Sequence, residues 1–196
     1  MSCLRLAAPI LLALAFALAA NPAPAQRAAP PPGQDSPAPL QPGDAFGEEV
    51  TLPERTIVYL KGHSNWDAAF DTLVDAFKSL TEYLDKQGIK PTGAAMTIYT
   101  QTDDTGFQFE AAVPIAAAPA NPPKGDIAIG QAPSGKALKF VHRGPYDAMD
   151  STYEAITNYL DDKHLDAKEL FIEEYATDLV KTDADNLLIN VFVPVK

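Results

Sequence analysis

Cysteine is almost absent from this sequence of 196 residues. Its single cysteine, Cys3, lies at the extreme N-terminus, before an apolar segment. A chain with one cysteine cannot form an internal disulfide, and it lacks the clustered thiolates of cysteine-based metal sites. Histidine is also scarce, with three residues in the whole chain. We therefore expect no metal site and no cofactor, and we expect an apolar core to hold the fold together.

Basic residues are too few to balance the acidic ones. The chain has 15 Lys and Arg against 26 Asp and Glu, which gives a formal net charge of −11 at pH 7. Nucleic acids and anionic membranes bind to basic surfaces, so this balance argues against both as partners. It favours a cationic or neutral small molecule as the ligand. The sequence does not identify a protein partner.

No apolar run is long enough to span a membrane. The longest, Leu6–Ala20, has 15 residues, whereas a spanning helix needs about 20. A basic residue precedes it and Ala23-Pro24-Ala25 follows it, as is typical of a secretory signal peptide. We predict that residues 1–25 are removed, with Ala17-Leu18-Ala19 as a second candidate cleavage site. The mature protein would then be periplasmic or secreted, and retention of the run as a membrane anchor is the alternative.

Proline and alanine dominate residues 26–43, which contain Pro30-Pro31-Pro32. Such a segment does not build a core, and we predict a disordered linker. It is also too short and too rich in proline for a helix-turn-helix. Residues 44–196 remain as the candidate domain, and a second proline-rich break, Ala116–Lys124, divides them into two similar lengths.

The two halves of this domain repeat each other. The Tyr-Leu-Asp sequence that begins at Tyr83 returns 76 residues later at Tyr159. The alternating segment that begins at Phe107 returns 80 residues later at Leu187, and both segments end in a proline followed by a branched apolar residue. These matches occur in the same order along the chain, which indicates an internal duplication.

Repeat one (residues 44–115) and repeat two (residues 125–196) each read as strand, helix, strand, strand. Apolar side chains recur at helical spacing from Phe70 to Leu84, and those of residues 107–115 alternate as in a strand. Asp103-Asp104-Thr105-Gly106 has the composition of a hairpin turn. We predict an α+β fold in which two tandem β-α-β-β repeats, related by pseudo-two-fold symmetry, form an antiparallel sheet with two long helices.

Repeat two also carries the motifs of a known family. His142-Arg143-Gly144-Pro145-Tyr146 precedes the helix, Glu173-Glu174-Tyr175 lies on the next strand, and Val193-Pro194-Val195 ends the last strand. This ordered set resembles the GyrI-like effector-binding domains, which also form the ligand-sensing part of AraC-type regulators. The resemblance extends from Ala45 to the end of the chain. It implies a ligand cleft between the repeats that is lined by aromatic residues and contains a buried acid.

The resemblance places this acid two residues before a strand tyrosine, which corresponds to Glu173. Neighbouring residues of a strand point to opposite faces, so Glu173 shares a face with Tyr175 while Glu174 faces away. Thr97 and Ile98 occupy the equivalent places in repeat one. An acid that breaks the symmetry of a duplication marks a functional site, and we predict that Glu173 binds the ligand. Two solvated acids on an edge strand are the alternative.

Aromatic faces attract cations and flat rings. We therefore add Tyr175, Tyr146, Trp66 and Tyr99 to the predicted ligand-binding residues, together with His142. Each has a structural alternative, which is packing for the aromatic residues and a hydrogen-bonded position in the core for the histidine. Tyr153 is a further aromatic candidate, but it belongs to the apolar stripe of the second helix, and a place in the core is the favoured interpretation.

These observations predict an exported small-molecule-binding protein of the GyrI-like effector-binding type that lacks a DNA-binding domain. The ligand is expected to be amphipathic or cationic, and no catalytic residue is assigned. The alternative is a small-molecule hydrolase on the same scaffold, with Glu173 as a general base and a tyrosine that orients water.

Overall fold

The computed structural model describes residues 40–121 and 123–196. The predicted signal peptide and nearly all of the predicted linker lie outside these residues. Among the described residues, no helix is both long and apolar enough to cross a membrane. The elements follow in the order β1 (Phe46–Leu52), β2 (Thr56–Asn65), α1 (Ala69–Gln87), β3 (Met96–Asp103), β4 (Gly106–Pro114), β5 (Ile127–Gln131), β6 (Gly135–Gly144), α2 (Met149–Lys163), β7 (Phe171–Tyr175) and β8 (Leu187–Pro194).

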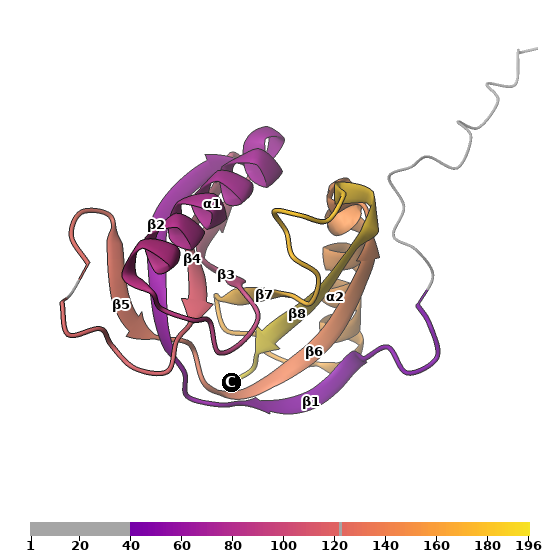
Figure 1. Ribbon diagram of the computed structural model, residues 1–196. Helices are drawn as coiled ribbons and strands as arrows, with labels where there is room; N and C mark the ends of the chain where they lie inside the picture. Colours follow the sequence, from indigo (N-terminus) through magenta and orange to yellow (C-terminus); the bar gives the residue numbers. More distant parts are fainter. Residues whose placement is uncertain (1–39, 122) are drawn as a thin grey trace, which may run out of the picture. The chain divides into compact units, whose positions relative to one another are not determined.

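All eight strands belong to one antiparallel sheet, in the order β1-β6-β8-β7-β3-β4-β2-β5. The equivalent strands of the two repeats are β1 and β5, β2 and β6, β3 and β7, and β4 and β8. Each pair lies at equal distances from the two edges of the sheet, so the order is symmetric about its centre. Helix α1 contacts β2 and β4, and α2 contacts β6, so the sheet carries one helix in each half (Figure 1). The predicted α+β fold with two tandem repeats is confirmed.

Each repeat has one strand more than the sequence predicted. Strand β1 of repeat one pairs with β6 of repeat two, and β5 of repeat two pairs with β2 of repeat one. The repeats therefore exchange their first strands. Sequence patterns did not reveal these strands because β1 carries Glu48 and Glu49 side by side and β5 has only 5 residues. Their partners lie in the other repeat, so no local hairpin pattern marks them.

The pseudo-two-fold axis passes between β3 and β7. Thr97 and Glu173 are equivalent by their spacing of 76 residues, and they are also direct cross-strand partners. Two residues along, the backbone N–H of Tyr175 donates to the carbonyl of Ala95 at 2.9 Å. The acid that breaks the symmetry of the sequence therefore lies next to the symmetry axis, in the middle of the sheet.

The main core lies between the helices and the sheet face that they cover. Phe109 of β4 and Ile189 of β8 point into it and are 2% and 0% exposed. Leu73 and Phe77, from the predicted stripe of α1, join the same cluster. The alternating and helical patterns found in the sequence are the core faces of these elements.

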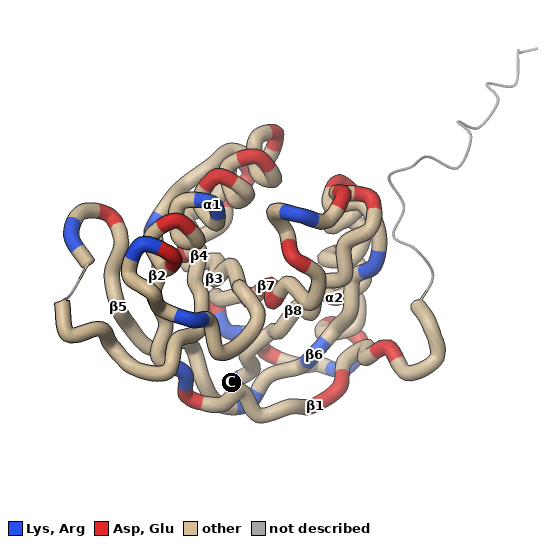
Figure 2. Tube along the Cα trace, in the orientation of Figure 1, with Lys and Arg blue, Asp and Glu red and all other residues tan. Residues whose placement is uncertain are grey.

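Acidic residues outnumber basic ones on both helices, as Figure 2 shows. Each helix nevertheless ends with a lysine in its last turn, where the helix dipole favours a positive charge. Part of the excess negative charge gathers at the site described below.

Candidate functional site

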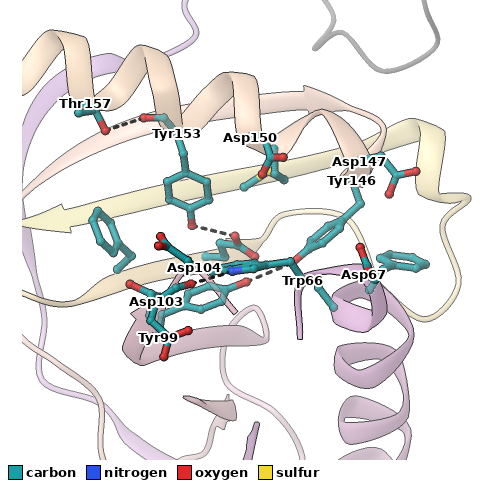
Figure 3. A pocket seen from close by; sticks show the side chains of 16 residues that line it. Trp66, Asp67, Tyr99, Asp103, Asp104, Tyr146, Asp147, Asp150, Tyr153 and Thr157 are labelled. Atoms are coloured by element: carbon teal, nitrogen blue, oxygen red, sulfur yellow. Dashed lines mark hydrogen bonds between the residues drawn. The ribbon is translucent and has the colours of Figure 1, made fainter. Parts of the chain in front are cut away.

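A cavity of about 930 Å³ lies where the N-terminal ends of both helices face the central strands β3 and β7 (Figure 3). This volume is in the upper part of the range for small-molecule pockets. Both repeats contribute to its wall. The lining residues are Trp66, Asp67, Ala69, Phe70, Tyr99, Thr102, Asp103, Asp104, Tyr146, Asp147, Met149, Asp150, Tyr153, Thr157, Phe171 and Glu173.

Glu173 is the buried acid of this pocket. Its side chain is 1% exposed, and its Oε1 accepts a hydrogen bond from the hydroxyl of Tyr153 at 2.8 Å. Its Oε2 accepts one from the hydroxyl of Tyr175 at 3.0 Å. Among residues 40–121 and 123–196, no Lys, Arg or His forms an ion pair with it. A buried carboxylate without a cationic partner is costly, and a bound cation would remove that cost.

Burial raises the pKa of the Glu173 carboxyl above its usual value, although hydrogen bonds from the surrounding tyrosines, first among them Tyr153, lower it in part. The pKa values of the surrounding tyrosine hydroxyls are also raised. Burial, followed by the charge of Glu173, raises the pKa of Tyr99, Tyr146, Tyr153 and Tyr175 well above 10. The four hydroxyls therefore keep their protons at neutral pH and act as hydrogen-bond donors.

Glu174 points to the other face of the sheet. Its Oε2 lies 3.0 Å from Nη1 of Arg55, and its Oε1 accepts from the amide of Asn190 at 3.4 Å. The alternation along β7 thus separates the two acids, and the structure bears out the expected register. Glu173 faces the pocket without an ion pair to any residue that the structure describes, whereas Glu174 is paired with Arg55.

Two further hydroxyl contacts organise the pocket floor. The hydroxyls of Tyr99 and Tyr146 lie 3.1 Å apart, which joins the two repeats. Beneath Glu173, the hydroxyl of Tyr175 lies 2.7 Å from that of Thr97. Because Tyr175 gives its only hydroxyl hydrogen to Glu173, Thr97 must be the donor in this contact.

Trp66 and Tyr146 lie at equivalent places, each in a short 3-10 turn that leads into its helix. The amide oxygen of Asn65 caps the first turn by accepting from Ala68 N at 2.9 Å. The Trp66 indole N–H donates to the carbonyl of Asp103 at 2.9 Å, which ties the tryptophan to the β3–β4 hairpin. Its side chain nevertheless stays 45% exposed, so a ligand can reach its face.

The wall of the pocket is strongly acidic. Six of its sixteen lining residues are Asp or Glu, and none of the sixteen is Lys, Arg or His. Together with the aromatic rings, this gives a site suited to an organic cation. The described residues contain no group of three or more His, Cys, Asp or Glu that could hold a metal ion.

Of the six predicted site residues, the structure places four in the pocket wall, namely Glu173, Tyr146, Trp66 and Tyr99. Tyr175 is outside this wall, and its hydroxyl donates a hydrogen bond to Oε2 of Glu173. It therefore positions the acid, and we no longer count it among the residues that touch a ligand.

His142 is also outside the wall. Its Nδ1 lies 2.8 Å from Oγ1 of Thr152, and its Nε2 lies 3.1 Å from the carbonyl oxygen of Pro145. A carbonyl only accepts, so Nε2 carries the hydrogen and Nδ1 accepts from Thr152. Burial lowers the pKa of this histidine and keeps it neutral. The ring holds the segment before Tyr146 against α2, which is a structural role.

The sequence interpretation considered Tyr153 as an aromatic candidate but favoured a place in the core, whereas the structure places it in the pocket wall. Tyr153 follows the spacing of the helix stripe, but its equivalent 80 residues earlier is Leu73. The hydroxyl at an otherwise apolar position was the available signal. The aspartates of the wall gave no comparable signal, because Asp67, Asp147 and Asp150 are ordinary residues for a first helical turn.

The fold and this pocket define a small-molecule-binding domain. Residues 48–196 match the sequence profile of the GyrI-like small molecule binding domain, and the chain belongs to this family. The resemblance seen in the sequence is therefore confirmed. A search of curated proteins found no match to the chain.

Solved structures share the fold at low sequence identity. EcmrR, in a complex with DNA, aligns with a TM-score of 0.66 and 17% identity over 77% of this chain, which spans 57% of the EcmrR chain. A hydrolase from Listeria innocua has a TM-score of 0.53 and 11% identity over 78% of this chain and 93% of its own. SAV2435 bound to tetraphenylphosphonium has a TM-score of 0.53 and 15% identity over 77% of this chain and 94% of its own.

Proposed function

We propose that this protein is an exported binder of amphipathic organic cations and that Glu173 is the anionic group that attracts them. The observation that carries the proposal is the buried carboxylate of Glu173, which faces a cavity of about 930 Å³ and forms no ion pair with any described residue. Aromatic rings from both repeats supply apolar contact. SAV2435, whose structure contains tetraphenylphosphonium, supports this ligand class.

Charge selectivity tests this proposal most directly. Tetraphenylphosphonium and tetraphenylborate have nearly the same size and shape but opposite charge. We expect the phosphonium to bind and the borate to bind at least tenfold more weakly, since the wall holds six acids and no base among its described residues. Trp66 is the only tryptophan and lines the pocket, so its fluorescence reports occupancy, and calorimetry gives the stoichiometry. Equal affinity for both ions, or a preference for the borate, would reject the cation-binding function.

The export proposal is supported by the sequence pattern of residues 1–25 alone. Intact-mass analysis of the protein recovered from the periplasm or medium should find Gln26 as the first residue, or Ala20 if the earlier site is used. Recovery of the uncleaved chain in the membrane fraction would contradict cleavage and favour the anchor.

A hydrolase on the same scaffold is the second candidate. The raised pKa of Glu173, which burial causes, is also what a general base near neutral pH requires, and one relative of the same fold is a hydrolase. Binding is favoured because both carboxylate oxygens of Glu173 already accept phenolic hydrogen bonds. These hydrogen bonds make the carboxylate a weaker acceptor for a proton from water than a carboxylate without them.

A further inference from the structure

A second, smaller cavity of about 370 Å³ adjoins the first one. The two cavities share three wall residues, namely Tyr99 and Thr102 of β3 and Phe171 of β7, so they are direct neighbours. The remaining wall residues of the second cavity are Thr100 and Gln101 of β3 and Ala167, Lys168 and Glu169 of the segment between α2 and β7. The proposed cation site therefore has an adjoining space that a bare aromatic cation does not need.

The second cavity follows from the unequal lengths of β3 and β7. Strand β3 runs from Met96 to Asp103, but its pairing with β7 covers only Met96–Tyr99. Residues 100–102 stay paired with β4 on one side, and no described strand pairs with them on the other. A strand edge of this kind offers backbone N–H and C=O groups for hydrogen bonds. The cavity lies along this edge, because all three residues line it.

The opposite wall is held in place by the end of the last strand. Ala167 forms a β-bridge with Val195, and the backbone N–H of Lys168 donates to the carbonyl of Pro194 at 2.8 Å. These contacts fix the backbone that faces β3. The second cavity is therefore formed before any ligand binds, as is usual for small-molecule sites.

The chemistry of the second cavity differs from that of the first. Its described wall has one base, Lys168, and one acid, Glu169, and its β3 side is polar and uncharged. Nε2 of Gln108 donates to Oε1 of Gln101 at 2.9 Å, and the amide nitrogen of Gln101 still has two hydrogens to donate. Gln101 and Lys168 thus supply donors, and Glu169 supplies an acceptor. This combination matches the carbonyl and the N–H groups of an amide.

We propose that the second cavity binds a neutral, amide-bearing arm of the cationic ligand. The cationic aromatic end occupies the first cavity near Glu173, the arm passes the shared wall at Tyr99 and Phe171, and the amide reaches Gln101. A carboxylate arm fits less well, because Glu169 and the acids of the first cavity repel it. This inference rests on the proposed cation-binding function and specifies the ligand class. It makes Gln101 a specificity-determining residue.

Gln101→Met, titrated by calorimetry with two matched probes, tests this inference. Carbamoylbutyl-triphenylphosphonium carries a terminal amide, and isoheptyl-triphenylphosphonium has the same shape with an apolar end. The substitution keeps the length of the side chain and removes its amide. It should weaken the amide probe about 2- to 10-fold, which is the usual range for one hydrogen bond. The affinities for the isoheptyl probe and for tetraphenylphosphonium should stay almost unchanged.

Gln131→Met is the matched control. Gln131 is exposed on β5, donates to Oγ1 of Thr56 at 3.2 Å and lines neither cavity. This variant should leave the affinity for both probes unchanged. On the wild type, nuclear Overhauser effects from the methylene group beside the amide to Gln101, together with effects from the phenyl protons to Tyr153, would support the placement of the arm.

Equal affinity changes for the two probes in Gln101→Met, including no change for either, would overturn the inference. Tighter binding of carboxybutyl-triphenylphosphonium than of the amide probe by the wild type would overturn it as well, since the second cavity would then select an anion. If the wild type binds tetraphenylphosphonium and only these arm tests fail, the cation-binding function stands. If the wild type binds none of the phosphonium ions, the proposed function itself fails, and this inference fails with it.

Discussion

Glu173→Gln is expected to weaken tetraphenylphosphonium binding by about 1–3 kcal/mol, which is about 5- to 150-fold in Kd. The substitution keeps the shape of the side chain and removes the one buried charge that faces the pocket. Calorimetric titration of the wild type and the variant at the same pH measures the difference. A loss of this size would show that the ligand is held by charge and not only by the aromatic walls.

Glu174→Gln is the matched control for this experiment. Glu174 is adjacent in sequence, but it lies on the other face of β7 and pairs with Arg55. It should leave tetraphenylphosphonium affinity almost unchanged. If both variants lose affinity equally, long-range surface charge explains the effect and Glu173 has no special role.

The pH dependence gives a second control. Burial raises the pKa of Glu173 above its usual 4.5, and a permanent cation binds its ionised form. Wild-type affinity should therefore be complete above the raised pKa and decline as the pH falls through it. Glu173→Gln should remove this decline. A wild-type affinity that stays constant down to the usual pKa would show that the pKa of Glu173 is not raised or that binding does not depend on its charge.

The same variant separates binding from hydrolysis. If Glu173 is a general base, Glu173→Gln abolishes product formation while substrate binding largely survives. If Glu173 attracts a cation, the variant loses affinity and no product forms with either protein. Product assays run beside the titrations therefore decide between the two functions.

Phe77→Ala and Ile189→Ala are each expected to reduce the free energy of unfolding by about 2–5 kcal/mol. Phe77 is 3% exposed on α1 and its ring lies 5.4 Å from that of Tyr175, while Ile189 is fully buried on β8. Both substitutions leave a cavity in the core that joins the helices to the sheet. Urea denaturation followed by circular dichroism measures the loss.

Lys78→Ala is a suitable control for these core variants. Its side chain is 54% exposed and its partner Asp75 lies one helical turn away on the surface. Pairs of this kind contribute little, so the variant should unfold within about 0.5 kcal/mol of the wild type. A comparably small loss from both core variants would mean that these faces do not carry the stability of the fold.

The sequence by itself determined the parts of this protein that depend on local periodicity. Strand alternation identified the buried face of β4 and β8, and helical spacing identified the stripe of α1 that includes Leu73 and Phe77. The same alternation separated Glu173 from Glu174, because neighbouring residues of a strand must point to opposite faces. Comparison of the two repeats then identified Glu173 as an acid that replaces the neutral Thr97 of repeat one.

Only the tertiary structure decided what depends on contacts between distant segments. The exchange of β1 and β5 joins strands that lie in different repeats, so no local pattern encodes it. Tyr153 has the spacing of a core residue, and its place in the pocket follows from the way α2 meets β7. Tyr175 lies outside the wall, and its hydroxyl contacts both Glu173 and Thr97, which is 78 residues away in the sequence. A pocket between two repeats is formed by the packing of one against the other, and that packing cannot be read from either repeat alone.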